Sequence, residues 1–164
     1  MSEENSIDVY SFEKENREYF ERSLPPRPAH YFDSESFKEI TRELLREQEN
    51  HDVYMHLIRD AQGTMVGRIN LSVLEDDRKT AELGYRIGEN VTNLGYASEA
   101  VKLVLEKAFT TYGLHKIIAG TATDNLISQR VLLKNGFTFS RIIENDFQMH
   151  NEWIHTAVFE IRNL

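Results

Sequence analysis

The sequence predicts an α/β fold of the α+β kind, with one mixed, mostly antiparallel, twisted sheet and helices on both faces. Three stretches of the 164-residue chain predict it. Residues 52–87 alternate apolar and polar side chains in three runs, as a β-meander does. Residues 80–120 carry the pattern of strand, loop, amphipathic helix and strand, which implies a parallel pair with a right-handed crossover. Residues 137–161 have the pattern of a closing hairpin.

Composition bounds the kind of protein. The 40% of hydrophobic residues suffice for an ordinary core, so residues 1–164 are expected to form a single domain. The lack of cysteine excludes disulfides, thiolate catalysis and cysteine-bound metals, and it fits a reducing compartment. The acidic opening Met-Ser-Glu-Glu-Asn is followed by no long apolar run, so we expect no secretory signal, no membrane span and a cytoplasmic location.

The net charge of −8 argues against a nucleic-acid partner, because a duplex-binding face must be basic to displace counterions. An acidic protein favours a cationic partner, although acidity is also an ordinary route to solubility.

The first fifty residues predict two helices. A short strand is expected over Ile7–Tyr10, followed by a helix over residues 12–22 that Ser11 caps and that the Pro25–Pro28 run stops. A second helix starts at Asp33 or Ser34 and ends at Glu49, with apolar residues at helical spacing. For both helices, a charged outer face over a core stripe is favoured over a direct catalytic part.

The middle of the chain predicts the meander. Strands over Val53–Leu57 and Met65–Leu74 flank a turn at Ala61–Gly63. A second turn at Asp76–Lys79 leads into a third strand, Thr80–Ile87.

The loop that ends at Gly95 opens directly into the clearest helix of the chain, which Gly113 ends. A helix start offers unpaired N–H groups and the positive end of the helix dipole, which suits a phosphate. The loop is neither a P-loop nor a dinucleotide fingerprint, because no Gly-Lys-Ser/Thr follows and the glycine spacing differs. A strand at Lys116–Gly120 follows the helix, so this helix start should face a crevice of the sheet.

The last elements are a helix opened by Thr123–Asn125 and closed by Asn135–Gly136, and a hairpin of Phe137–Phe147 and Trp153–Ile161. The residues 148–152 form the expected hairpin loop.

This order of elements, together with two motifs, resembles the GNAT superfamily of acyl-CoA-dependent N-acetyltransferases. The family's pyrophosphate loop reads Gln/Arg-x-x-Gly-x-Gly/Ala, which corresponds here to Thr92–Ala97. Gly95 and Ala97 fit that pattern, while Thr92 departs from it. The pair Asn125 and Ser128, followed by Leu-Leu-Lys-Asn-Gly-Phe, is similar to the second acetyl-CoA motif of the family.

More narrowly, Glu82–Gly88 and the strand of Trp153 resemble the RimJ/RimL-type ribosomal-protein N-terminal acetyltransferases, as do Glu15–Arg17 and Pro25–Tyr31. The resemblance implies acetyl-CoA as cofactor, CoA as product and no metal. It also implies that the backbone around Arg86, Ile87 and Gly88 pairs with the pantetheine arm, with the Ile87 N–H as donor to the thioester carbonyl. The implied cofactor contacts continue with Thr92, Asn93, Leu94, Gly95, Tyr96, Ala97, Ser98, Asn125, Ser128 and Lys134.

Several of these residues have plainer alternatives. The Ile87 side chain and Tyr96 can serve as packing, and Lys134 can point into solvent. Asn125 can be only the helix cap, a role that is compatible with binding a cofactor.

The resemblance assigns the proton donor of the departing thiolate to Ser128, although this hydroxyl can equally be a simple CoA contact. An α-amino group has a pKa near 8, so a weak base suffices to deprotonate it. Glu82 is the first candidate for that base and Glu144 the second, each with an exposed or ion-paired carboxylate as the alternative. His115 and His155 are further candidates, although His115 follows a helix C-terminus and can instead interact with the carbonyls of that helix.

The expected acceptor walls are Tyr31, Phe32, Tyr85, Phe147 and Trp153, each of which can instead be core. The resulting hypothesis is an N-acetyltransferase in which a neutral amine attacks the thioester directly, with the N-terminal α-amine of a ribosomal protein as the favoured acceptor. The alternatives are acetylation of a small amine (a polyamine, antibiotic or amino acid) and an acyl-CoA-binding module without catalysis. The chain is expected to be a monomer or a homodimer.

Overall fold

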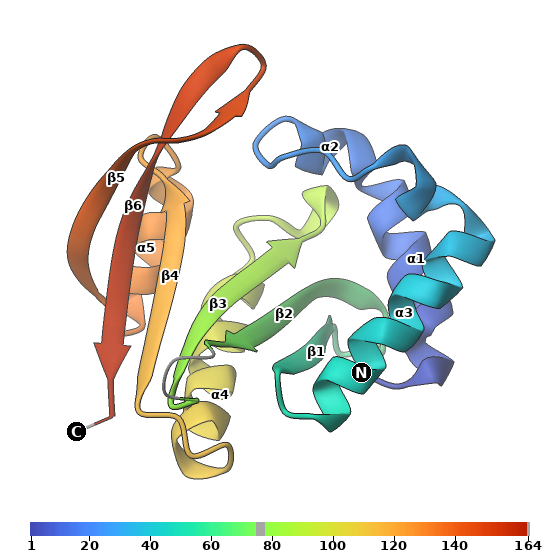
Figure 1. Ribbon diagram of the computed structural model, residues 1–164, viewed down its shortest axis with the longest axis horizontal. Helices are drawn as coiled ribbons and strands as arrows, with labels where there is room; N and C mark the ends of the chain where they lie inside the picture. Colours follow the sequence, from blue (N-terminus) through green and yellow to red (C-terminus); the bar gives the residue numbers. More distant parts are fainter. Residues whose placement is uncertain (75–77, 164) are drawn as a thin grey trace.

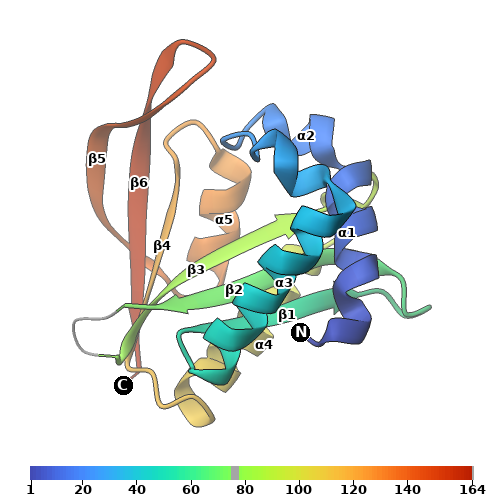
Figure 2. The ribbon, with the colours of Figure 1, turned by 45° about the vertical axis from the view of Figure 1, so that its right-hand side comes forward.

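The computed structural model describes residues 1–74 and 78–163. Its centre is a six-stranded sheet in the order β1-β2-β3-β4-β6-β5, in which only the neighbours β3 and β4 run parallel (Figure 1). Helices α1 to α3 lie over one face of β1 and β2, and α4 and α5 lie over the other face of the sheet (Figure 2). The predicted mixed sheet with helices on both faces is therefore confirmed.

The N-terminal helices differ in their bounds from the prediction. Residues expected as a strand, Ile7–Tyr10, belong to α1 (Ser6–Glu15), which follows a short 3-10 turn at Glu3–Asn5. Val9, Phe12 and Glu13 face the interior at helical spacing. This spacing, and not the short alternation of apolar residues from Ile7, determines the structure of the segment. The single helix predicted over residues 12–22 is interrupted where the Asn16 side chain donates to the carbonyl of Phe12.

After this break, α2 (Arg17–Glu21) completes the first helical segment, and the proline run leads to a 3-10 turn at Ala29–Phe32. The helix predicted from Asp33 or Ser34 is confirmed as α3 (Ser34–Glu49). Asp33 is its N-cap, and its carboxylate accepts from the Ser36 N–H at 3.0 Å, which lowers the Asp33 pKa.

The meander is confirmed as β1 (Val53–Arg59), β2 (Met65–Val73) and β3 (Thr80–Ile87), all antiparallel to their neighbours in the meander. The predicted turn at Asp76–Lys79 falls partly outside the described residues. Strand β3 ends at Ile87, as expected, and a 3-10 turn at Glu89–Val91 begins the loop toward the next helix.

The crossover and the closing hairpin also follow the prediction. Helix α4 (Tyr96–Thr110) connects β3 to the parallel strand β4 (Lys116–Ala122). Helix α5 (Leu126–Lys134) precedes the hairpin of β5 (Thr138–Met149) and β6 (Glu152–Arg162). The hairpin loop is shorter than expected, because only His150 and Asn151 lie between the strands, both with positive φ.

The main core lies between the sheet and α4. Five buried residues of α4 pack against the alternate residues of β2, β3 and β4 that point to this face, Ala81 and Leu83 among them. A second, smaller cluster joins α1, α3 and the turn after the prolines through Val9, Phe37 and Tyr31. Helices therefore pack against both faces of the sheet.

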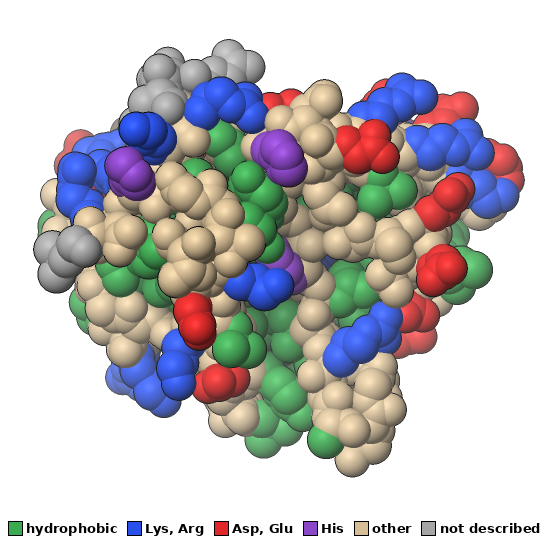
Figure 3. All heavy atoms as spheres, turned by 90° about the horizontal axis from the view of Figure 1, so that it is seen from below, with side chains coloured by type: hydrophobic (Ala, Val, Ile, Leu, Met, Phe, Trp, Pro, Cys, Tyr) green, Lys and Arg blue, Asp and Glu red, His purple; other side chains and the backbone are tan. Residues whose placement is uncertain are grey.

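The surface gives no sign of a single dominant charge on the face seen in Figure 3, where basic and acidic side chains lie side by side with hydrophobic side chains between them. In the part of the chain that the structure describes, no helix is long and apolar enough to cross a membrane.

Candidate functional site

The first feature of the site is a gap in the sheet between β3 and β4. The two strands pair only at Thr80–Lys116, Ala81–Ile117 and Glu82–Ile118. Beyond these pairs, β3 continues to Ile87 and β4 to Ala122, and the strands diverge (Figure 1). Their facing edges therefore enclose a wedge that is closed at the paired end and open at the other.

The backbone of β3 has open hydrogen-bonding groups toward this wedge. The Gly88 N–H donates to Val66 of β2, and the Thr80 carbonyl accepts from Leu74 on the same side. Because backbone groups alternate in direction along a strand, the even-numbered residues of β3 face β2. The N–H and C=O groups of Leu83, Tyr85 and Ile87 consequently point into the wedge.

The second feature is the loop that leads from β3 into α4. Asn93 and Gly95 adopt left-handed backbone conformations, with φ of 61° and 89°. The residue that departs from the expected loop pattern, Thr92, donates its hydroxyl to the Glu89 carbonyl at 3.1 Å, so its side chain is turned to its own loop. Gly95 is the N-cap of α4, and no side chain caps this helix start in the described structure. The N–H groups of the first turn are thus available to an anion.

A groove of about 550 Å³ lies directly at this helix start. Most of the predicted cofactor residues that line it come from the loop and α4, and Lys134 and Asn135 come from the end of α5. Asn135 Nδ2 donates to Ser98 Oγ at 3.3 Å and joins the two helices. The groove is lined by Leu94, Gly95, Tyr96, Ser98, Glu99, Lys102, Lys134 and Asn135.

Two lysines and one glutamate give this groove a net positive lining, which suits phosphate groups. The residues present therefore fit acetyl-CoA: the groove offers N–H groups and ammonium groups to a pyrophosphate, and the wedge offers an unpaired strand edge to an extended amide-containing arm. Among residues 1–74 and 78–163, no His, Asp or Glu side chains are grouped so that three of them could hold a metal ion.

The third feature is a hydroxyl pair that joins β3 to α5. Asn125 caps α5 by accepting from the Ser128 N–H at 3.1 Å, which fixes the first turn of this helix. Ser128 Oγ and the Tyr85 hydroxyl share a hydrogen bond of 2.9 Å. Burial raises the pKa of Tyr85, with the bond to Ser128 as an opposing influence, so the phenol stays protonated at neutral pH. Two residues that the sequence assigned to different roles, proton donor and acceptor wall, thus lie in contact.

The two carboxylates proposed as bases are both exposed. Glu82 is the last residue of β3 that pairs with β4, and its side chain points to the face opposite that of Tyr85, since side chains alternate along a strand. Glu144 lies where the pairing of β5 with β6 is irregular, between Ile143 and Phe147. One further base candidate, His155, accepts through Nδ1 from the Asn145 N–H at 3.1 Å in this irregular stretch.

The aromatic residues predicted as acceptor walls lie in different environments. Tyr31 is only 6% exposed and packs edge-on against Phe37, so its side chain belongs to the smaller core cluster. Phe32 is half-buried, with the Arg17 guanidinium 4.4 Å from its ring centre. Phe147 and Trp153 lie near the end of the β5–β6 hairpin, and Trp153 is 55% exposed.

The tip of this hairpin reaches the helical layer on the other side of the wedge. His150 Nε2 lies 3.0 Å from the carbonyl oxygen of Glu21, the last residue of α2. The hairpin and α2 therefore meet above the open end of the wedge, and Figure 1 shows the hairpin extending beyond the rest of the sheet toward α2.

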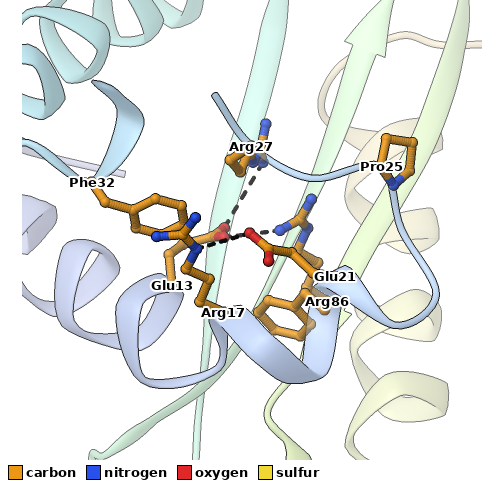
Figure 4. Close-up of a pocket in the computed structure, with 8 residues that line it drawn as sticks. Glu13, Arg17, Glu21, Pro25, Arg27, Phe32 and Arg86 are labelled. Atoms are coloured by element: carbon orange, nitrogen blue, oxygen red, sulfur yellow. Dashed lines mark hydrogen bonds and ion pairs between the residues drawn. The ribbon is translucent and has the colours of Figure 1, made fainter. Parts of the chain in front are cut away.

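The sequence did not reveal a buried ion cluster between α1, β2 and β3. Glu13 is 1% exposed, and its two carboxylate oxygens accept from Arg68 at 3.0 Å and Arg86 at 2.9 Å. Arg27 lies 3.9 Å from the same carboxylate (Figure 4). Arg86 was predicted as a cofactor contact through its backbone, whereas its side chain belongs to this cluster. A signal was present in the sequence, because Glu13 follows Val9 by one helical turn and so falls on the buried face of α1.

The family model described as "Acetyltransferase (GNAT) domain" matches residues 3–138 of this chain. Among proteins of known name, "Probable N-acetyltransferase YjcK" of Bacillus subtilis (strain 168) is 29% identical over 153 residues, which cover 92% of this chain and 84% of that protein.

Solved structures with the same fold include the ribosomal-protein-S5-alanine acetyltransferase from Vibrio fischeri, with a TM-score of 0.92 at 18% identity, covering 99% of this chain and 90% of the other. The ribosomal L7/L12 α-N-protein acetyltransferase RimL in complex with CoA gives 0.86 at 18% identity, with coverages of 99% and 90%. Spermidine N-acetyltransferase from Vibrio cholerae, in complex with CoA and spermine, gives 0.81 at 17% identity, with coverages of 99% and 92%. At these identities the likeness shows the fold.

Proposed function

Because the chain belongs to the GNAT acetyltransferase family, we propose that it transfers the acetyl group of acetyl-CoA to the N-terminal α-amine of a protein. The observation that carries this proposal is the wedge between β3 and β4, which opens beside the uncapped start of α4. The protein acceptor is supported by the structural relatives that act on ribosomal proteins.

Acetyl-CoA, the acyl donor of this family, supplies the acetyl group as an activated thioester. The acceptor amine attacks the thioester carbonyl carbon, a C–N bond forms, and the C–S bond breaks. The amine loses one proton to a base, and the departing sulfur takes up one proton, so the transfer is balanced without a redox partner or a covalent enzyme intermediate. The protein has to orient the reactants, polarise the carbonyl and move these two protons.

Polarisation of the carbonyl is assigned to an N–H group of the open β3 edge. We keep Ile87 as the candidate, because its N–H points into the wedge and lies next to the loop that leads to α4. A backbone donor held by a packed strand keeps its direction without further ordering, which is the property required of an oxyanion-type donor.

The proton for the departing sulfur is assigned to the hydroxyl pair of Ser128 and Tyr85. Ser128 is the direct donor and Tyr85 holds it in position through the 2.9 Å hydrogen bond. A thiol has a pKa near 8.5, so its anion leaves readily and the donor is expected to assist rather than to decide the rate.

The base is assigned to Glu82, with Glu144 as the second candidate. Five residues, about 17 Å along a strand, separate Glu82 from Ile87, so Glu82 would take the proton through a chain of water molecules. Glu82 is exposed and lies at the closed end of the wedge, on the face of β3 that carries Arg86. An α-amine with a pKa near 8 is partly neutral at pH 7.5, so an exposed carboxylate suffices to accept its proton.

The second candidate function is acetylation of a small polyamine. It is favoured by the net charge of −8, which attracts cations, and by the likeness to the spermidine acetyltransferase. Incubation of the protein with radiolabelled acetyl-CoA and either ribosomal proteins or spermidine separates the two. Label that appears only on spermidine would refute the protein acceptor.

A module that binds acyl-CoA without turnover is tested by calorimetry with acetyl-CoA followed by the same transfer assay. Binding at micromolar concentration with transfer to any amine is expected. Binding without transfer to any acceptor in the panel would favour the module.

A further inference from the structure

We propose that the arginine cluster around Glu13 is a subsite for a carboxylate carried by the acceptor, so that the preferred amine acceptors are acidic. This inference rests on the proposed function, since it concerns the acceptor of that reaction.

The cluster holds more positive charge than its carboxylates neutralise. Around the pocket of Figure 4, Arg17, Arg27 and Arg86 face Glu13 and Glu21, and Arg68 reaches Glu13 from β2. Four arginines thus surround two glutamates. Both oxygens of Glu13 are already taken by Arg68 and Arg86, and Glu21 is paired with Arg17 at 2.8 Å.

Arg27 is the arginine of the cluster that makes no hydrogen bond to either glutamate. Its terminal nitrogen is 3.9 Å from Glu13, beyond hydrogen-bond distance, and its Nε is buried without a hydrogen-bond partner among the described residues. Its guanidinium lies 4.8 Å from the Tyr31 ring centre, and this stacking orients the group without neutralising it. The Arg27 side chain is 34% exposed, so its charge is partly solvated, and the buried Nε–H is the donor whose missing partner costs free energy.

A purely structural role accounts for only part of the cluster. Glu13 with Arg68 and Arg86 attaches α1 to β2 and β3, and that attachment requires no third arginine beside it. The pocket itself, at about 10 Å³, has room for about one water molecule, so a carboxylate would bind at its mouth. There it meets two excess positive charges and can accept from the exposed part of the Arg27 guanidinium through two parallel hydrogen bonds.

The position of the cluster also fits an acceptor rather than the cofactor. Arg86 and Glu82 lie on the same face of β3, opposite the face of Tyr85, and are separated by four residues, which corresponds to about 13 Å along a strand. The assigned carbonyl donor, Ile87, directly follows Arg86, so an acceptor whose amine reaches the thioester at Ile87 would place a nearby carboxylate close to Arg86 and Arg27. Glu21, at the edge of the pocket, also meets the hairpin tip through its carbonyl oxygen.

The test is calorimetric binding of two matched pairs of amines to the protein saturated with CoA. The first pair is Ser-Glu-Glu-Gly amide and Ser-Gln-Gln-Gly amide, and the second is serine and serine amide. We expect the carboxylate member of at least one pair to bind about tenfold more tightly or better, as a charged hydrogen bond in a partly buried site provides. The pair that shows the preference identifies whether the carboxylate belongs to a peptide side chain or to a free amino acid.

Arg27→Gln is expected to remove this preference and to leave the affinity for acetyl-CoA unchanged, and Arg27→Lys is expected to restore part of it. Arg22→Gln is the matched control, since Arg22 is 64% exposed on the neighbouring segment, pairs with Glu89 and lies outside the pocket. Arg17→Gln serves as a second cluster variant, which removes the ion pair with Glu21 and the contact of the guanidinium with the Phe32 ring.

Equal binding of the members of both pairs, or a preference that survives Arg27→Gln and Arg17→Gln, would overturn the subsite. Because these measurements need no turnover, they are separate from the transfer assay. A carboxylate preference without acetyl transfer to any amine would refute the proposed function and leave the subsite standing.

Discussion

Replacing Glu13 by glutamine is the most direct test of how the N-terminal helix is held to the sheet. The substitution keeps the shape of the side chain and removes its charge, so Arg68 and Arg86, whose side chains are 15% and 16% exposed, lose their common counter-ion. Breaking a buried pair in this way costs about 3–5 kcal/mol. The arginines retain some contact with water, so we expect a loss near the lower end, about 3 kcal/mol.

Equilibrium unfolding in urea measures this loss. With a slope of about 1–3 kcal/mol per molar for a small protein, a loss of about 3 kcal/mol should lower the midpoint by roughly 1–3 M. Glu15→Gln is the control, because Glu15 is exposed on the same helix and its change should stay within about 0.5 kcal/mol. If Glu13→Gln lay within about 1 kcal/mol of the unmodified protein, the ion cluster would not be what attaches α1 to β2 and β3.

Three further predictions concern the hydroxyl pair, the loop and the first strand. Tyr85→Phe and Ser128→Ala should each lower kcat by roughly 10- to 100-fold in steady-state kinetics, because the two hydroxyls share a hydrogen bond. The double variant should be no slower than Ser128→Ala, whereas a loss equal to the product of the two single losses would show that the hydroxyls act independently. Gly95→Ala and Gly63→Ala should each lower the free energy of unfolding by about 1–2 kcal/mol, because both glycines have φ above 80° with open space at Cβ. Only Gly95→Ala should also weaken acetyl-CoA binding, and equal affinities of the two variants by calorimetry would show that Gly95 is not part of the site. Burial lowers the pKa of His56, and the charges of Lys107 and the N-terminal amine lower it further, so the unfolded chain takes up a proton on His56 more readily than the folded protein does. The contribution of His56 to stability should therefore be complete above about pH 6.5 and decrease as the pH falls below it. His56→Gln should make the melting temperature less dependent on pH in this range.

An element of this fold could be predicted from the sequence where the residues that determine it are close together in the chain. The bounds of β3 follow from strict alternation between two turns, and α5 follows from Asn125 at one end and Gly136 at the other. The strand expected at Ile7–Tyr10 was wrong, because two apolar residues at a spacing of two are too few to distinguish a strand from the start of a helix.

The site divides in the same way. The loop and the helix start could be predicted, because the glycine before a helix and the helix pattern that follows it are adjacent in the sequence. The contact of Tyr85 with Ser128 spans 43 residues, and that of Glu13 with Arg86 spans 73. Such pairs depend on how β3 passes between the two helical layers, and no pattern within a single element contains that information.

The wedge between β3 and β4 has a consequence for what can enter the sheet. Open strand edges are where foreign chains pair and aggregation starts. Here the edge lies inside the sheet and narrows to the paired residues Glu82 and Ile118, while the hairpin tip and α2 meet over its mouth through His150 and Glu21. Because β3 and β4 pair at one end and the hairpin tip meets α2 over the other, an added strand cannot extend along the whole of either edge, whereas a short amide chain can pair along part of it. The same geometry thus admits a small extended ligand and protects an exposed edge from other proteins.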